Sequence, residues 1–477
     1  MTLLHEQLPT ESSAEAEALF KQARRRRRRL RLLTATIVMV SILVGSVVLV
    51  STASNRRTAR APAPQSTSTR HGALVPTDSD HPTTAYVADA GRIVPVSLAS
   101  NRVEPPIPVP ELNLGQSSTD VVVSPSGTTA YTVSLPQPLH SGSDQSGPTV
   151  VLINLVQRRV ESEIPFSASA IQPGVSGSRP SFFVDALALT PNGRTLLIAD
   201  AADNEILSVD LSTRRLGTPV VLPKELPQNW LIKSIAQPTY SPRPPAPITD
   251  LAISPDGKMA YVVDGYAVIP VDLADHRAEQ PIKGFDGPDR IAISPDGQTA
   301  YVTNPYCWEV IHTGQCQLPP RRPLVEPNGR IQLFAGGDEI SVVNLSGGRI
   351  ARTLTLGKAS EPTGIAVSPD GSLLYVTHGA YSPQGRFLSV LTPTGIEVVR
   401  IDDGLGVNTG ANAVAIAPAG SEAYLSSFQI VTPGPFAPTV LRGVIAVNLK
   451  NRTAGSPVDF GSPVAYGTST GGVAFGR

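Results

Sequence analysis

The sequence predicts an all-β fold, a seven-bladed β-propeller with four antiparallel strands in each blade. The first observation is the segment 289–304, DRIAISPDGQTAYVTN, in which a Ser-Pro-Asp-Gly turn joins two apolar runs. Apolar runs of this kind form strands, and Pro, Asp and Gly form the tight turn between them. Near-copies cover the segments 120–134, 186–200, 250–264, 364–378 and 413–427. The chain is therefore an array of repeats.

The second observation is a twelve-residue motif that places a polar turn between two apolar ends. It recurs seven times, at 96–107, 153–164, 209–220, 271–282, 343–354, 390–401 and 447–458. This motif predicts a third strand, a turn and a fourth strand. Four antiparallel strands, in a repeat that is 40 residues long at its shortest, suit a propeller blade.

The third observation is that the carboxy-terminal residues complete the first repeat. The unit around Tyr86 has no apolar run before its turn, whereas Gly472 to Phe475 matches Gly364 to Val367 and ends where a turn would begin. We expect the tail to supply the innermost strand of the first blade, because such closure leaves no free sheet edge. The predicted blades cover 82–116 with 472–476, 120–165, 185–222, 249–284, 289–357, 363–402 and 412–460.

Three predicted strands that follow Ser-Pro-Asp-Gly turns end in similar five-residue sequences, AYVTN at 300–304, LYVTH at 374–378 and AYVVD at 260–264. In these motifs the chain resembles the YVTN-family seven-bladed propellers, over roughly residues 82–477. The resemblance implies the propeller fold. Proteins similar to this family include surface-layer components, binding propellers and lactonase-like enzymes, so the resemblance implies no single activity and no catalytic set.

The amino terminus predicts a membrane anchor. Residues 32–50 are 19 uncharged, mostly aliphatic residues, which suffice to cross a bilayer, so we expect a signal anchor over 32–53. Eight cations within 21–31 predict that the basic segment 1–31 stays in the cytoplasm and that the propeller lies outside the cell membrane. The alternative is secretion after signal cleavage near Ala53.

Amino-acid composition predicts a stalk before the propeller and the kinds of ligand that the propeller binds. Residues 54–80 are rich in Pro, Ser and Thr and predict a flexible stalk, which leaves 81–477 for the propeller. Beyond residue 31 the chain carries 31 cations and 35 anions, and aromatic residues are only 5%. A mildly acidic domain with few aromatics gives no support for nucleic-acid binding. We expect a monomer that binds a protein, a glycan or a small ligand.

Five long insertions predict which face of the ring recognises a ligand. They cover 135–149, 166–184, 223–247, 305–338 and 429–441. In an antiparallel blade all five connections leave from the same face, and loops on a rigid scaffold often carry binding residues. The alternative is that they are surface insertions that the fold merely tolerates, since long loops cost little extra entropy.

The longest insertion contains both cysteines, Cys307 and Cys316. Outside the membrane we expect them to form a disulfide, which would contribute about 2 to 3 kcal/mol by ordering this loop. Two free thiols are the alternative, and a zinc site that adds His312 lacks a fourth ligand nearby. Trp308 is a candidate anchor for a partner, unless it packs under its own loop.

The second strands end in polar residues at one height around the ring, which we call the collar. Its members are Asp89, Ser134, Asp200, Asp264, Asn304, His378 and Ser427. The collar could bind a polar ligand with His378 as proton acceptor, or a cation such as calcium through Asp89, Asp200, Asp264 and Asn304. The alternative is that these side chains satisfy the backbone of the next turn. No other cofactor is expected.

These patterns favour a binding module that recognises its ligand at the insertion-bearing face, without catalysis. The first alternative is a lactonase-like hydrolase at the mouth of the central channel, and the second is a non-catalytic envelope scaffold. The Gly-x-Ser-x-Gly match at 467–471 is no argument for a hydrolase, because no helix follows it.

Overall fold

The computed structural model describes residues 83–476 apart from 90, 110–119, 135–147, 166–183, 202, 224–247, 265, 286, 308–320, 326–330, 358–359, 380–381, 383–384, 402–408, 433–438, 461–463 and 466–471. The predicted basic segment, membrane anchor and stalk all lie outside these residues. In the described part of the chain no helix is long and apolar enough to cross a membrane.

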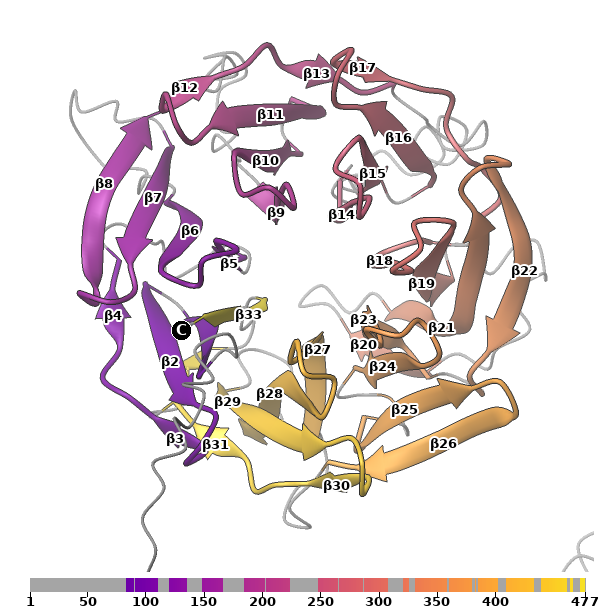
Figure 1. The fold of residues 1–477 in the computed structure, drawn as a ribbon. Coiled ribbons are helices and arrows are strands. Elements are labelled where there is room, and N and C mark those ends of the chain that lie inside the picture. The colour runs from indigo at the N-terminus through magenta and orange to yellow at the C-terminus, as the bar shows by residue number, and fades with distance from the viewer. Residues whose placement is uncertain are drawn as a thin grey trace, which may run out of the picture. The chain divides into compact units, whose positions relative to one another are not determined.

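Seven antiparallel sheets stand in a ring, one for each predicted blade (Figure 1). From the ring axis outward the strands are hydrogen-bonded in chain order, except that the first blade begins with β33 and that in the fifth blade β20 pairs outside this order with β21. The prediction of an all-β, seven-bladed propeller with four antiparallel strands per blade is confirmed.

The two inner layers of the ring contain the strands of the first repeat motif. The innermost strands are β33 (Val473–Gly476), β5 (Val122–Val123), β9 (Val184–Leu189), β14 (Asp250–Ile253), β18 (Ile291–Ile293), β23 (Pro362–Val367) and β27 (Thr409–Ile416). The second strands are β1 (Thr84–Asp89), β6 (Thr129–Ser134), β10 (Thr195–Asp200), β15 (Met259–Val263), β19 (Thr299–Cys307), β24 (Leu374–His378) and β28 (Glu422–Thr432).

The two outer layers contain the strands of the twelve-residue motif. The third strands are β2 (Arg92–Ser97), β7 (Thr149–Asn154), β11 (Glu205–Asp210), β16 (Val268–Asp272), β21 (Ile331–Asn344), β25 (Phe387–Thr392) and β29 (Thr439–Asn448). The outermost strands are β3 (Arg102–Val103) with β4 (Ile107–Pro108), β8 (Arg159–Pro165), β12 (Arg215–Leu216) with β13 (Val220–Val221), β17 (Arg277–Ala278), β22 (Arg349–Thr355), β26 (Gly395–Arg400) and β30 (Thr453–Ala454) with β31 (Val458–Asp459).

The carboxy-terminal strand closes the ring, as predicted. β33 pairs with β1 from Thr84 opposite Gly476 to Val87 opposite Val473. The first blade therefore takes its innermost strand from the end of the chain and its other strands from the beginning. Tyr424 of the last blade meets Phe475 of β33 edge to face, with ring centroids 5.7 Å apart, so the tail also packs against the blade before it.

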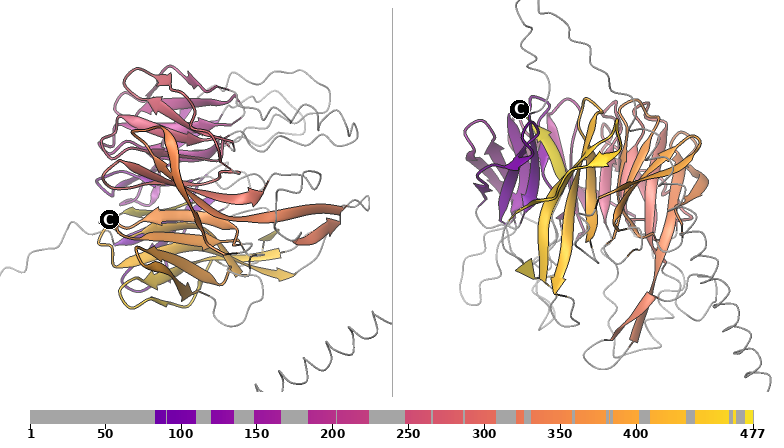
Figure 2. Two further views of the ribbon diagram at one scale, coloured as in Figure 1. Left: turned by 90° about the vertical axis from the view of Figure 1, so that its right-hand side faces the viewer. Right: turned by 90° about the horizontal axis from the view of Figure 1, so that it is seen from below.

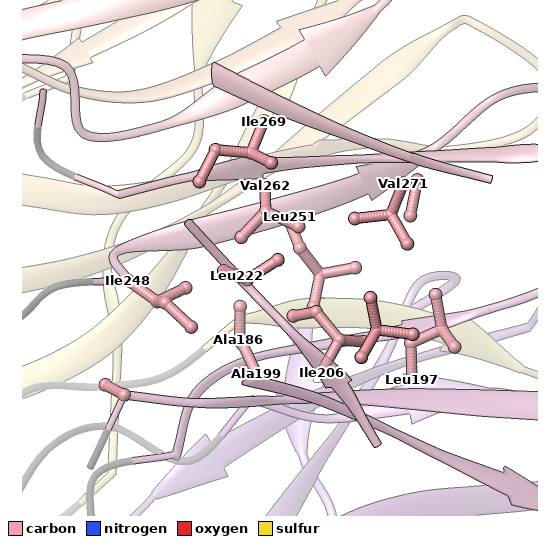
Figure 3. Close-up of a cluster of buried hydrophobic side chains, with 13 residues drawn as sticks. Ala186, Leu197, Ala199, Ile206, Leu222, Ile248, Leu251, Val262, Ile269 and Val271 are labelled. Carbon is pink, nitrogen blue, oxygen red and sulfur yellow. The ribbon is translucent and has the colours of Figure 1, made fainter. Parts of the chain in front are cut away.

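Seven hydrophobic clusters hold neighbouring blades together, one at each blade-to-blade interface. Figure 3 shows the cluster between the third and fourth blades, where Leu197 and Ile206 face Leu251 and Ile269. Alternating strand residues supply these contacts, because successive side chains point to opposite faces of a sheet. The cluster between the last and first blades includes Val473 and Phe475, so the closure is packed like the other interfaces.

The Ser-Pro-Asp-Gly turns build one face of the ring, which we call the turn face. In the fourth blade the Ser254 hydroxyl donates to Asp256 Oδ1 (2.6 Å) and accepts the Met259 N–H (3.0 Å). Gly257 closes the turn at φ +72° and lies against Pro191 of the preceding turn, whose Cδ would be 3.3 Å from an added Cβ. The same neighbours recur at Gly193 and Pro125, Gly297 and Pro255, Gly371 and Pro295, and Gly420 and Pro369. The turn motif therefore packs neighbouring blades against each other, in addition to joining two strands within one blade.

All five long insertions leave from the opposite face, which we call the insertion face, as predicted. The strand order requires this, because each insertion connects a second to a third strand or one blade to the next. Two insertions are partly strand instead of plain loop. β19 and β21 continue past the ring and β21 pairs there with β20 (Arg321–Val325), while β29 pairs with β32 (Val464–Ala465) (Figure 2). In both blades the antiparallel pairing of the second and third strands continues beyond a local register shift.

A buried ion pair joins the first and last blades. Asp89 Oδ1 lies 2.7 Å from Arg442 Nη1 of β29, and both side chains are almost fully buried. Asp89 Oδ2 accepts a hydrogen bond from Arg92 Nε (2.9 Å), and Arg92 Nη2 donates to the Phe460 carbonyl (2.8 Å). One carboxylate therefore serves two guanidinium groups at the closure.

We predict that Asp89→Asn lowers the free energy of unfolding by about 3 to 5 kcal/mol, because it leaves the buried Arg442 without a counter-charge. The double variant Asp89→Leu with Arg442→Leu should recover most of this loss. Urea unfolding of the three proteins measures both effects. Equal stability of Asp89→Asn and the wild-type chain would contradict the assigned role.

Candidate functional site

Four charged residues gather around the ring axis at the insertion face, where the innermost strands begin. They are Asp120, Asp250, Asp289 and Arg290, from the second, fourth and fifth blades, and we call them the axial group. All four are partly buried.

The repeat explains why they meet. Asp120, Asp250 and Arg290 each stand four residues before the first residue of their turn. The equivalent residues of the other blades are Gly472, Ala186, Gly364 and Ala413. Small residues suit this crowded position, so three charged side chains here stand out from the repeat.

Asp120 connects three blades. Its Oδ1 accepts the Gly472 N–H at 2.9 Å, and its carboxylate also accepts the Leu187 N–H. Gly472 belongs to the first blade and Leu187 to the third. A Cβ added to Gly472 would lie 2.4 Å from Asp120 Oδ1, so this contact requires glycine.

Asp250 and Arg290 connect the fourth and fifth blades. Asp250 Oδ2 accepts the Ile291 N–H and Oδ1 accepts the Leu251 N–H, both at 2.9 Å. Arg290 Nη1 donates to the Thr249 carbonyl at 3.2 Å. These contacts hold the carboxylate and the guanidinium at fixed positions beside each other.

Burial governs the ionisation of the axial carboxyls. It raises the pKa of Asp120 and of Asp289, and in both cases the Arg290 charge offsets part of the effect. Burial also raises the pKa of Asp250 to about 7, with Arg290 lowering it and the Asp120 charge raising it. The charges of three blades therefore act on one another across the axis. At neutral pH the axial group combines carboxylate oxygens that accept hydrogen bonds, the Arg290 guanidinium that donates them, and the Asp250 carboxyl, whose pKa is close to the pH.

No protein-family model matches this chain, and no curated protein matches it. Among solved structures it is similar to a protein of unknown function from Desulfotomaculum acetoxidans, with 15% identity, coverage of 83% of this chain and 99% of that chain, and a TM-score of 0.49. A candidate 6-phosphogluconolactonase from Bacteroides uniformis gives the same identity, coverage and TM-score. Hydrazine synthase from Kuenenia stuttgartiensis gives 18% identity, 69% and 77% coverage and a TM-score of 0.44. None of these likenesses assigns an activity.

The structure buries the whole predicted collar. Asp89 takes part in the ion pair at the closure. Asp264 Oδ1 accepts the N–H groups of Tyr266 (2.9 Å) and Ala267 (2.7 Å), so it satisfies the turn that follows it. The Asn304 amide donates to Ser341 Oγ at 3.0 Å. A ligand-binding role for these three residues stays a prediction.

His378 is fully buried, and both of its ring nitrogens are hydrogen-bonded. Nδ1 lies 2.8 Å from the Ser360 carbonyl and Nε2 lies 2.8 Å from Ser389 Oγ. Because a carbonyl only accepts, Nδ1 carries the proton and Nε2 accepts from the serine hydroxyl. Burial lowers the pKa of His378 to about 4, against a smaller opposing effect of the Ser360 bond, and keeps the ring neutral at physiological pH.

Asp200 is the collar member that lies in an acidic cluster. Its carboxylate oxygen and those of Asp203 and Glu205 are all within 4.8 Å of one another, and this is the one cluster of three or more metal-type ligands among the described residues. The calcium site predicted from Asp89, Asp200, Asp264 and Asn304 is therefore not assembled there. Asp89 pairs with Arg442 of the last blade, and Asp264 and Asn304 make their contacts within their own blades.

The predicted loop residues fall largely outside the described part. Cys307 ends β19, but Cys316 and Trp308 lie outside the described residues, so the disulfide and the anchoring role stay predictions. The described residues contain no disulfide. A shallow groove of about 470 Å³ is lined by residues in and around β13 and β17, among them Val221, His276 and Arg277. These two strands lie at the outer rim of the ring, far from its axis (Figure 1).

The axial group and the acidic cluster are functional candidates that reasoning from the sequence missed. Aligning the repeats at the turn serine would have found the first, since Asp120, Asp250 and Arg290 replace Gly or Ala. The crowding of Asp203 and Glu205 into the turn after Asp200 would have found the second.

We predict that His378 makes the fold less stable at acid pH. Its folded pKa of about 4 lies below the unfolded value of 6.5, so the unfolded chain binds the extra proton between these values. The contribution of neutral His378 to the free energy of unfolding is fully present above pH 6.5, and it falls by about 3 kcal/mol as the pH drops to 4.

The measurement compares urea unfolding of the wild-type chain and His378→Gln at pH 7 and pH 4.5. Asp250 changes stability in the opposite direction over this range, but it is common to both proteins and cancels in their difference. A difference between the two proteins that does not change with pH would contradict the assignment.

Proposed function

We propose that this chain is a binding module that holds a polar ligand at the ring axis on its insertion face. The observation that carries the proposal is that Asp120, Asp250 and Arg290 replace small residues at the strand starts of this face. The ends of the strands that flank all five insertions share the same face. Charged groups and variable connections are therefore combined where loops on a rigid ring usually bind ligands.

The chemistry of the axial group indicates the class of ligand. Three carboxyls, Asp120, Asp250 and Asp289, accept hydrogen bonds, and Arg290 donates them. A ligand with amine or hydroxyl donors suits the carboxyls, and a carbonyl or carboxylate on the same ligand suits the guanidinium. Amino-bearing glycans and basic peptides have both kinds of group.

The sequence supports a place for this module at the cell envelope. The uncharged segment 32–50 and the cations before it favour a single membrane span with the propeller on the extracytoplasmic side. A proline-rich segment of 54–80 would separate the ring from the bilayer. A ligand on a neighbouring envelope component would then be within reach of the insertion face.

We predict that the double variant Asp250→Asn with Arg290→Gln binds about 10- to 100-fold more weakly, because charge-assisted hydrogen bonds contribute roughly 1.5 to 3 kcal/mol. The probes are arrays of amino-bearing glycans and of basic peptides. Asp256→Asn is the matched control, since Asp256 is an exposed acid on the turn face. Array binding that is the same in the wild-type chain and the double variant would contradict the proposal.

One observation favours a second candidate, a lactonase-like hydrolase at the same site. Burial raises the pKa of the Asp250 carboxyl to about 7 despite the opposing charge of Arg290, and its Oδ1 and Oδ2 are held at the ring axis by backbone N–H groups, which suits a general acid or base. Turnover of a lactone panel by the full chain, abolished by Asp250→Asn alone and retained by Asp256→Asn, would replace the binding-only proposal. Absence of turnover together with array binding would support it.

A further inference from the structure

The turn between β10 and β11 holds three carboxylates at the insertion face of the third blade. Asp200 ends β10, Glu205 begins β11, and the two are directly opposite each other in the last antiparallel pair. The two residues are 3% and 8% exposed. Like charges in this arrangement repel each other, and burial strengthens the repulsion.

The first blade shows how the same position is satisfied elsewhere in the ring. There the last pair of the second and third strands is Asp89 with Arg92, whose Nη2 lies 2.8 Å from Asp89 Oδ2. The third blade has Glu205 where the first blade has Arg92. At this position the first blade has the cationic side chain of Arg92, and the third blade has the anionic side chain of Glu205.

The Glu205 carboxylate belongs to the cluster and lacks a partner among the residues that the structure describes. Among the described residues no hydrogen bond or ion pair reaches its carboxylate, although Glu205 is only 8% exposed. Burial, and then the charges of Asp203 and Asp200, raise its pKa. Asp203 Oδ2 is a second buried oxygen for which the described residues offer no hydrogen bond. A buried acceptor that lacks a partner is costly, and a bound cation would satisfy Asp203 Oδ2 and offset the charge of Glu205.

The turn is held in place by contacts of Asn204, and within it Asp200 Oδ1 accepts the Asp203 N–H at 3.3 Å. Asn204 adopts a left-handed conformation at φ +58°. Its Nδ2 donates to the Leu222 carbonyl, and its own carbonyl accepts the Leu222 N–H, both at 2.9 Å. The acidic side chains are therefore brought together by the fold itself.

We propose that Asp200, Asp203 and Glu205 bind a divalent cation, and that the cation is calcium. All three ligands are carboxylate oxygens, which suit hard cations, and they converge in a turn that can add backbone carbonyls and water. Calcium accepts such irregular sets of six to eight oxygens more readily than magnesium, which demands a near-octahedral shell. The cation takes the place that Arg92 has in the first blade and stabilises the insertion face, independently of any ligand at the ring axis.

The test measures thermal unfolding of the chelator-treated full chain with and without 10 mM calcium chloride. For a site of about 10⁻⁴ to 10⁻³ M affinity, calcium should raise the Tm of the wild-type chain by about 2 to 4 °C. Glu205→Arg recreates the pair of the first blade. It should unfold at a higher Tm than the wild-type chain without calcium, and calcium should no longer shift it.

Two further variants keep the proposal falsifiable if Glu205→Arg fails to fold. Glu205→Gln keeps the side chain's size and should weaken calcium binding at least 10-fold in titration calorimetry. Asp264→Asn is the matched control, because Asp264 follows the second strand of the next blade and caps its own turn. It should keep the full calcium shift.

Three results would overturn the proposal. They are no shift and no binding heat in the wild-type chain, an equal shift in Glu205→Gln, or a larger shift with magnesium than with calcium. Loss of the shift in Asp264→Asn together with its retention in Glu205→Arg would instead place the cation at the collar of the neighbouring blade.

Discussion

The pairing of β33 with β1 is the interaction on which this architecture depends, because it turns a row of seven sheets into a ring. Without it the first blade would lack its innermost strand and the last blade would lose one neighbour. The structure supports the closure with the hydrophobic cluster around Val473 and Phe475 and with the buried contact of Asp89 and Arg442. Every blade then packs against a neighbouring blade on both sides.

The two faces of the ring differ because the repeat constrains only one of them. On the turn face the glycines of the third to seventh blades lie against the proline of the preceding turn, as Gly257 does against Pro191, so the motif cannot vary freely. On the insertion face the described contacts between repeats, such as Asp120 with Gly472, are particular to a few blades, and long connections are accommodated there. The axial group and the acidic cluster of Asp200 both lie on this freer face.

The sequence was sufficient to predict the ring because its period, its turns and the match of residues 472–475 to an inner strand are local patterns. The environment of each side chain was not predictable in this way. Asp89 and Asp200 occupy the same place in the repeat, but one faces Arg92 and the other Glu205. An alignment of the repeats locates Asp120 and Arg290 in place of small residues, but it could not predict that their charges act on each other, because they are far apart in sequence.

The closure can be tested most directly by hydrogen–deuterium exchange of the full chain at neutral pH. If β33 completes the first blade, the amides of β33 and β1 exchange as slowly as those of β10, which lies between β9 and β11 inside the third blade. Exchange of β33 at the rate of an unstructured peptide, while β10 stays protected, would show that the ring is open and would contradict the account.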